Sequence, residues 1–494
     1  MVTSDLLRRG IDASRARPAA LVLAVVCVAQ FMVVLDISIV NVALPDMQRD
    51  LHMSQNGLAW VLNAYTLTFA GFLLLGGRAA DIWGRRRLFL IGVTLFSAMS
   101  LVGGLAQSGG ELIAARGLQG LGGAVLSPAT LTILTTTFRE PAARARALGM
   151  WSAVAGAGGA TGVLAGGVLT DLFSWRWILF INVPIGILVF LVARYAVTES
   201  RAEGERPTLD WAGALTVTGG LVALVYGIVS TDTHSWGSRS VISYLVIGAL
   251  LVGVFLVVES RHRHPLVPLR LFRSRALTGA NLIMVLIGSV MFSLFFFLSQ
   301  FLQNVQGYSP LKTGLAFLPM PLAIIIGTQI SSRLVQRVGA RVLLVTGPLI
   351  SAAGLLLLSR LHADSSYLWH IGLPGALITF GVGMSFVPIT ISATGGVDPR
   401  DAGLASGLIN TTRQIGGSLG LAILLTIAAS RTHALASSGP NVAETAGYAR
   451  TFGISALVMV VAAVVALTIL PPLTRNRRDV AAVDEPSLAP ALEG

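Results

Sequence analysis

Charged side chains are scarce in this sequence. Asp, Glu, Lys and Arg make up 12% of its 494 residues, whereas hydrophobic residues make up 54%. A soluble protein carries roughly 25% charge, so no water-soluble fold could cover this much apolar surface. Within lipid only helices or closed barrels satisfy the backbone, and barrel strands alternate apolar and polar residues. The apolar runs here are continuous over roughly twenty residues, which predicts an all-α polytopic membrane protein.

Cysteine is nearly absent, and nucleotide-binding motifs are missing. Cys27 is the single cysteine and the seven histidines lack metal-ligand spacing, so neither an intrachain disulfide nor a metal site is expected. No GxxxxGK[ST] motif is present, which excludes ATP hydrolysis by that route. The net charge of +12 comes from arginines in short loops between apolar runs, where they orient helices. We therefore expect no enzyme, no cofactor, and no nucleic-acid or ATP partner.

Fourteen apolar runs are long enough to cross a membrane. With a cytoplasmic N-terminus, 26 basic residues fall in cytoplasmic segments and 7 in external ones, as the positive-inside rule requires. The first run is too long for a cleaved signal peptide, so we expect it to be retained. The expected spans lie near residues 19–45, 57–80, 88–106, 110–137, 145–170, 177–196, 211–230, 241–259, 276–301, 311–334, 341–360, 369–394, 401–429 and 449–471.

One loop pattern occurs twice. GRAADIWGRRR at 77–87 follows the second run, and SRLVQRVGARV at 332–342 follows the tenth. This offset of eight spans predicts two six-helix halves with two helices inserted between them, and a substrate site between the halves. The expected division is a cytoplasmic arm at 1–18, a six-helix bundle at 19–196, two inserted helices with linkers at 197–275, a second six-helix bundle at 276–471 and a cytoplasmic tail at 472–494.

The first copy of this loop is a candidate conformational switch. Its glycines permit tight turns against a neighbouring helix, and its acid can pair with an arginine while helices tilt. The alternative is a plain positive-inside anchor. Gln336 replaces the acid in the second copy, so a charged lock would be one-sided. The residues concerned are Gly77, Asp81, Gly84, Arg85, Arg86 and Arg87.

The loop resembles the signature cytoplasmic loop of the major facilitator superfamily. LDISIVNVALP at 35–45, SWRWILFINVPIG at 174–186 and FLQNVQGYSPLKTGLAFLP at 301–319 resemble motifs of its fourteen-span drug:proton antiporter branch, the EmrB/QacA type. The resemblance extends from about residue 20 to 470. It implies a major facilitator fold with fourteen helices arranged as 6+2+6, and it implies export more than any particular substrate.

Asp36 is the candidate proton-coupling residue. It is the one acid of 23 that lies well inside an expected span, where a carboxylate costs about 2.5–3.5 kcal/mol and burial favours its protonated form. The alternative is a structural hydrogen bond at a helix break near Asn41. Arg116, in RGLQGLGG at 116–123, needs a buried acceptor, either Asp36 or backbone carbonyls. It would tune the proton affinity of Asp36 or simply tie two spans together.

The fifth expected span carries a stripe of glycines. Gly158, Gly162 and Gly166 are four residues apart and are followed by Gly167, so one helix face is open to close approach by another backbone. The resemblance implies an antiporter motif here, which usually has a proline after its central glycine. This sequence has Val163 there. Ordinary close packing is the alternative.

Polar and aromatic side chains within the spans are candidate substrate-cavity residues. Several lie on the glycine-rich run at 401–429, where polar groups suit a cavity wall. For each aromatic residue, packing or lipid contact is the alternative. The candidates are Asn41, Tyr65, Gln119, Phe292, Phe296, Gln300, Gln303, Asn410, Arg413 and Gln414.

Together these features predict a multi-pass transporter of the bacterial inner membrane with both termini cytoplasmic. We expect it to work as a monomer and to export small amphipathic drugs, antibiotics and dyes in exchange for protons by alternating access. The alternative is a dedicated exporter of one endogenous metabolite or self-made antibiotic. Since only one carboxylate lies within the bundle, we expect neutral or monocationic substrates rather than dications.

Overall fold

Helices make up nearly all of the regular structure. The computed structural model describes residues 2–201, 208–262, 264–395, 397–398 and 401–470, and these ranges contain no β-strand. The expected tail at 472–494 lies outside them. The helices are α1 (Val2–Asp50), α2 (Gln55–Trp83), α3 (Arg85–Leu105), α4 (Gly109–Thr137), α5 (Pro141–Leu172), α6 (Trp177–Phe180), α7 (Asn182–Ala196), α8 (Trp211–Val229), α9 (Arg239–Arg261), α10 (Arg275–Gln300), α11 (Pro310–Phe317), α12 (Pro319–Val338), α13 (Ala340–Leu358), α14 (Leu373–Thr394), α15 (Ala402–Ala434) and α16 (Pro440–Ile469).

Fourteen helical segments in the described ranges are long and apolar enough to cross a membrane, which confirms the predicted number. Four of these segments each combine two elements: α6 with α7, α10 with the π-helix η3 (Phe301–Val305), α11 with α12, and the π-helix η4 (Leu368–Gly372) with α14. Several helices extend beyond the expected spans. α1 runs through Pro45 to Asp50, and α16 begins at Pro440 rather than near 449. Hydropathy marks only the apolar part of a helix, whereas its polar end turns can reach the headgroup region.

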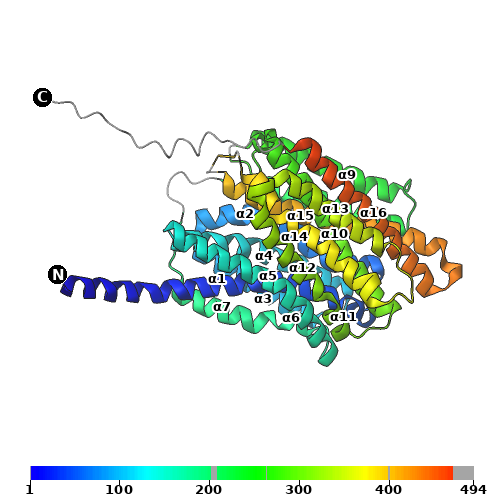
Figure 1. Ribbon diagram of the computed structural model, residues 1–494, viewed down its shortest axis with the longest axis horizontal. Helices are drawn as coiled ribbons and strands as arrows, with labels where there is room; N and C mark the ends of the chain where they lie inside the picture. The colour runs from blue at the N-terminus through cyan, green and yellow to red at the C-terminus, as the bar shows by residue number, and fades with distance from the viewer. Residues whose placement is uncertain (1, 202–207, 263, 396, 399–400, 471–494) are drawn as a thin grey trace.

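The helices pack in two main groups. In the first, α2 and α3 pack on α4, and α1 packs on α5; in the second, α10 packs on α15, and α12 and α13 pack on α14. α8 and α9 pack on each other, and α8 also contacts α2 and α15. Figure 1 places α1, α3 and α7 along one side of the molecule and α9, α13 and α16 along the other. These contacts are compatible with the expected 6+2+6 division, which stays a prediction.

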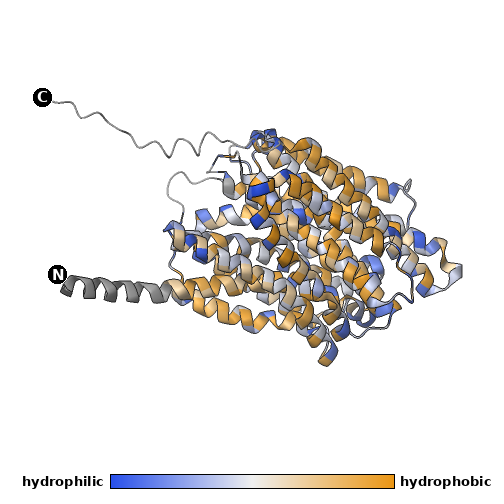
Figure 2. Cartoon of the chain, in the orientation of Figure 1, coloured by the Kyte–Doolittle hydropathy of each residue, from blue (hydrophilic) through white to orange (hydrophobic). Residues whose placement is uncertain are grey.

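The surface of the helices is apolar along most of their length. Figure 2 shows hydrophobic residues covering the helical shafts, with hydrophilic residues concentrated at helix ends and in loops. α9 is the extreme case, since only 11% of its most apolar stretch is buried within the protein. Exposed aliphatic side chains of this kind are stable in lipid and would be costly in water.

The two ends of the bundle differ in how the two helix groups meet. We call the end that carries the Gly84 turn the switch-loop end, and the end that carries the α1–α2 connection the opposite end. At the opposite end, α11 approaches α5 so closely that a Cβ on Gly167 would lie 2.7 Å from the carbonyl oxygen of Pro310. At the switch-loop end, Gly149 and Gly156 of α5 have no neighbouring atom within 4 Å of a built Cβ.

Candidate functional site

A buried ion pair joins α1 to α4. Asp36 is fully buried, Arg116 is 1% exposed, and Nη1 of Arg116 lies 2.5 Å from Oδ2 of Asp36. Arg116 also donates to Oε1 of Gln119 at 2.8 Å, and through Nε to the carbonyl of Val61 at 3.4 Å. Two ions are tolerated in a low-dielectric interior when they are paired and further hydrogen-bonded. The sequence predicted either Asp36 or a backbone carbonyl as the acceptor for Arg116. The structure provides both, namely the carboxylate of Asp36 and the carbonyl of Val61.

The second carboxylate oxygen of Asp36 accepts two amide hydrogen bonds. Nε2 of Gln119 donates to Oδ1 at 2.8 Å, and Nδ2 of Asn182, at the start of α7, donates to it at 2.9 Å. Asn182 is fully buried and also donates to Oγ of Ser100 in α3 at 3.0 Å. Groups from α4 and α7 thus bind this carboxylate of α1, and Ser100 of α3 binds Asn182 in turn. The sequence prediction missed Asn182, although an asparagine amid the apolar residues of ILFINVPIG was a usable signal.

Tyr65 provides a fourth partner for Arg116. The guanidinium carbon of Arg116 lies 4.4 Å from the centroid of the Tyr65 ring, which is fully buried and stacks on Phe69. This cation–π contact lets the cation stay in the interior if the carboxylate loses its charge. Protonation of Asp36 would therefore change the contacts among four helices without exposing Arg116 to lipid. Tyr65 and Gln119, expected as cavity residues, belong to the surroundings of the ion pair.

The switch loop contains a local ion pair between Asp81 and Arg85 and a carboxylate that caps the N-terminus of α3. Arg85 donates through Nη2 to Asp81 at 2.8 Å, but both side chains are partly exposed, so the pair contributes at most about 1 kcal/mol. The carboxylate of Glu199 instead accepts the backbone N–H groups of Arg86 and Arg87 at 3.2 and 3.1 Å. This caps the N-terminus of α3, where a negative charge is favourable. Glu199 was not predicted because it lies beyond α7, in a polar stretch remote in sequence.

Of the two glycines predicted in the switch loop, Gly84 has a conformation and surroundings that require glycine, whereas Gly77 does not. Gly84 has φ of +111°, and a Cβ there would lie 2.5 Å from Oε1 of Glu199. A Cβ on Gly77 would meet only the side chain of Pro128, at 3.4 Å. Its neighbour Gly76 is the tightly packed glycine, since its Cβ would lie 2.4 Å from the carbonyl oxygen of Ala124. The close approach of α2 to α4 therefore depends on Gly76.

The glycine stripe of α5 lies against α1. A Cβ on Gly162 would lie 1.9 Å from Oγ of Ser38 and 2.8 Å from the carbonyl oxygen of Leu35, and one on Gly166 would lie 2.7 Å from that of Ile39. Gly158 faces α1 as well, whereas Gly167 faces α11. The stripe thus places α5 directly beside the segment of α1 that carries Asp36.

Three expected cavity residues lie near the contacts of α1 and α2 with α10 and η3. Gln303 donates to the carbonyl of Val42 at 2.7 Å, and Gln300 donates to Oε1 of Gln55 at 3.0 Å. The carbonyl of Asn41 accepts a hydrogen bond from the hydroxyl of α10 residue Ser299 at 2.7 Å. These bonds join the two helix groups at the opposite end of the bundle.

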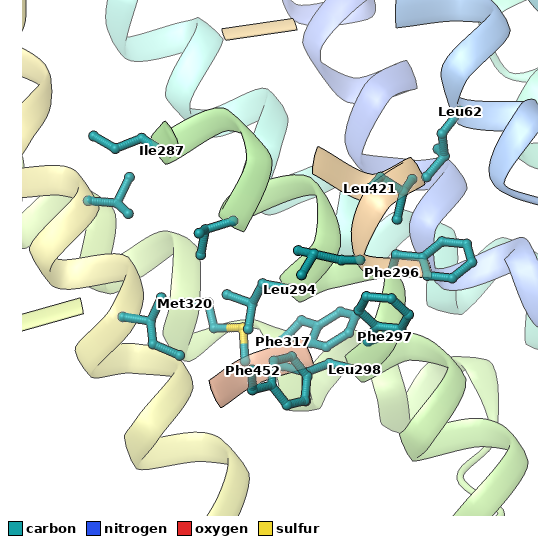
Figure 3. Packing of buried hydrophobic residues seen from close by; sticks show 14 of the residues in the cluster. Leu62, Ile287, Leu294, Phe296, Phe297, Leu298, Phe317, Met320, Leu421 and Phe452 are labelled. Carbon is teal, nitrogen blue, oxygen red and sulfur yellow. The ribbon is translucent and has the colours of Figure 1, made fainter. Parts of the chain in front are cut away.

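The two expected aromatic residues of α10 are packed against protein. Phe296 is fully buried and lies edge-on to Phe297 at a centroid distance of 5.3 Å. Figure 3 shows both side chains within the apolar cluster. Phe292 is partly buried and lies against Gly417 of α15. Neither lines the cavity that holds Asn410 and Arg413.

Asn410 and Arg413 share a cavity of about 140 Å³ at the switch-loop end. Gln414, next to them in α15, is buried with no hydrogen-bond partner for its Nε2 among the described residues. The cavity lies between α10, α14 and α15 and is lined by Met284, Phe386, Thr390, Ala393, Thr394, Ser406, Ile409, Asn410 and Arg413.

A second, open cavity of about 1440 Å³ lies at the opposite end of the bundle, beside α13, α15 and α16.

Comparison with known proteins decides the family. Residues 26–421 match the family described as Major Facilitator Superfamily. The chain belongs to this superfamily. It is 44% identical over 466 residues to a cephamycin export protein of Amycolatopsis lactamdurans, covering 94% of this chain and 95% of the relative. It is 41% identical to a puromycin resistance protein of Streptomyces alboniger, covering 92% and 91%. It is 38% identical to the multidrug resistance protein Stp of Mycobacterium tuberculosis, covering 81% and 74%.

Solved structures share the fold of this superfamily member. An auto-inhibited POT family peptide transporter superposes with a TM-score of 0.66 at 16% identity, covering 94% of this chain and 98% of that one. A bacterial homolog of the human lysosomal transporter Spinster, inward-facing and unoccupied, gives 0.64 at 18% identity, covering 91% and 96%. The protein is therefore a multi-pass membrane transporter of small molecules and not an enzyme.

Proposed function

We propose that this protein exports amphipathic antibiotics, drugs and dyes across a bacterial inner membrane in exchange for protons. Relatives at 38–44% identity are named for cephamycin export, puromycin resistance and multidrug resistance, which supports the direction and class of transport. The observation that carries proton coupling is the fully buried carboxylate of Asp36, bound by Arg116, Gln119 and Asn182. A buried acid of one helix that is bound by groups from two others is suited to turn one proton into a movement of helices.

The proposed mechanism is alternating access by a monomer with cytoplasmic termini. In that orientation the switch-loop end faces the cytoplasm and the opposite end faces outward. The contacts of Gly167 with Pro310 and of Gln303 with Val42 would then close the outer side, so a compound enters from the cytoplasm. After outward release, a proton from outside neutralises Asp36 and weakens its hold on Arg116, which permits the return. Loss of that proton to the cytoplasm restores the ion pair.

The proton gradient is large enough for this task. One charge moving through 100 mV is worth about 2.3 kcal/mol, and one pH unit adds about 1.4 kcal/mol. Because each 1.4 kcal/mol is a factor of ten, a single proton per cycle could maintain a substrate gradient of several hundredfold. Such a gradient suffices to protect a cell from an antibiotic.

The test is transport into inside-out proteoliposomes that contain the purified protein. A cephamycin, puromycin and ethidium are offered with an imposed pH gradient, acidic inside, and accumulation is followed over time. We expect accumulation of at least one compound above its external concentration, and loss of accumulation when a protonophore is added. Uptake that only equilibrates, with or without the gradient, would contradict proton coupling.

A second candidate is the export of one endogenous antibiotic. Two relatives that are more than 40% identical carry names that refer to a single antibiotic, which favours a narrow substrate range. The same panel separates the candidates. A multidrug exporter accumulates compounds of several classes, whereas a dedicated exporter accumulates one class and ignores the rest.

A further inference from the structure

Arg413 is a cation without a counter-ion. It belongs to none of the five ion pairs formed within the described part of the chain. Its Nε is buried and has no hydrogen-bond partner among those residues. The residue as a whole is partly buried and lines a cavity, and charged groups inside spans usually mark the path of a substrate or ion. Packing alone therefore does not account for this arginine.

The cavity around Arg413 has the composition of an anion site. Its hydroxyl and amide groups come from Thr390, Thr394, Ser406 and Asn410, and no acidic residue lines it. Its volume of about 140 Å³ equals the liquid volume of a few water molecules. That space admits a carboxylate group together with part of the body that carries it. Apolar side chains complete the wall, namely Met284, Phe386, Ala393 and Ile409.

Asp36 does not supply a compensating negative charge. Its carboxylate is fully buried and is already neutralised by Arg116. Both residues belong to the first helix group, whereas Arg413 belongs to the second. The expectation of cationic substrates assumed that this carboxylate was free to pair with the substrate, and the structure removes that basis. The charge that remains for a substrate is the positive charge of Arg413.

We propose that Arg413 binds the carboxylate of the exported compound, so that the preferred substrates are amphipathic monoanions. This inference rests on the proposed export function and names its substrate class. A guanidinium offers two parallel N–H donors that match the two oxygens of a carboxylate. The hydroxyl group of Ser406 lines the same cavity and can turn to donate to the anion, whereas the hydroxyl group of Thr394 donates to the carbonyl of Thr390 at 2.8 Å.

The test is equilibrium binding to the full-length protein in lipid nanodiscs, without any gradient. Three fluorescent probes share a dansyl group: dansylglycine is an anion, dansylglycinamide is neutral and dansylcadaverine is a cation. We expect the wild type to bind the anion roughly tenfold to hundredfold more tightly than the neutral amide, as for a charge-assisted hydrogen bond. Arg413→Gln should remove this preference, while Arg413→Lys should keep part of it because the charge remains. Arg337→Gln removes an exposed charge from the last turn of α12, outside both cavities, and should change nothing.

Two outcomes would overturn the proposal. One is a wild type that binds the cation as tightly as the anion, a result that does not depend on any variant folding. The other is a folded Arg413→Gln protein that still prefers dansylglycine. Gradient-driven export is measured separately in proteoliposomes. A wild type that prefers the anion but never transports it would refute the export function and leave the anion site standing.

Discussion

The guanidinium of Arg116 in α4 lies 2.5 Å from the carboxylate of Asp36 in α1, and neither side chain is more than 1% exposed. Removing one partner from such a pair costs about 3–5 kcal/mol, because the other is left charged in a low-dielectric interior. The two side chains therefore act as one unit. A proton that neutralises Asp36 also changes what Arg116 must bind.

Asn182 should influence how fast the protein exports. In Asn182→Ala, the carboxylate of Asp36 loses one of its two amide hydrogen bonds, and a bond of this kind is worth about 1.5–3 kcal/mol. Since that bond joins α7 to α1, its loss should lower the export rate by about tenfold. Export is measured in proteoliposomes at a fixed pH gradient and electrical potential. Ser100→Ala is the matched control, because it leaves the bond between Asn182 and Asp36 in place. Equal export rates for Asn182→Ala and wild type would count against this role.

Two glycines of the switch loop should differ in their response to alanine. Gly84→Ala places a side chain at a φ of +111° and against Glu199, with a strain of about 1–2 kcal/mol from the backbone alone. Gly77→Ala makes only ordinary contact with Pro128. We expect Gly84→Ala to lower both the melting temperature and the export rate, and Gly77→Ala to change neither appreciably. Equal behaviour of the two variants would show that the turn does not depend on the conformation of Gly84.

The glycine stripe of α5 offers a second matched pair. Gly162→Ala would bring a Cβ to 2.8 Å from the carbonyl oxygen of Leu35 and force α5 away from α1, at a cost of about 1–3 kcal/mol. Gly159→Ala meets no atom within 4 Å and should stabilise the helix by about 0.5–1 kcal/mol. Thermal unfolding in detergent should therefore show shifts of opposite sign. A tolerated Gly162→Ala would mean that the helices are less closely packed than the structure indicates.

The fold could be predicted because the length of each apolar run can be counted in the sequence and compared with the thickness of a membrane. Asp36 could be found because acids within spans are rare, and Arg116 because a buried cation needs an acceptor. Asn182 and Glu199 could not be placed in the same way. Each acts on a residue more than 100 positions away, and only the packing of α7 against α1 and α3 brings them together.

Residue type alone was also a poor guide to cavity walls. The sequence predicted Gln303 as a cavity residue because a polar group in an apolar helix needs a hydrogen-bond partner. In the structure that partner is the backbone carbonyl of Val42 in α1. Arg413 has the same sequence pattern and lines a cavity instead. The difference depends on how far apart the facing helices stand, which local sequence does not encode.

The most direct test of the account is gradient-driven export by Asp36→Asn. Asparagine has nearly the size of aspartate but does not titrate, and Arg116 would retain Gln119, Tyr65 and the Val61 carbonyl. Proteoliposomes with an imposed pH gradient are compared with counterflow exchange, in which labelled substrate enters against unlabelled substrate without any gradient. We predict that the variant loses accumulation against a gradient and keeps counterflow. A folded Asp36→Asn protein that still concentrates its substrate when the pH gradient is imposed would contradict the account.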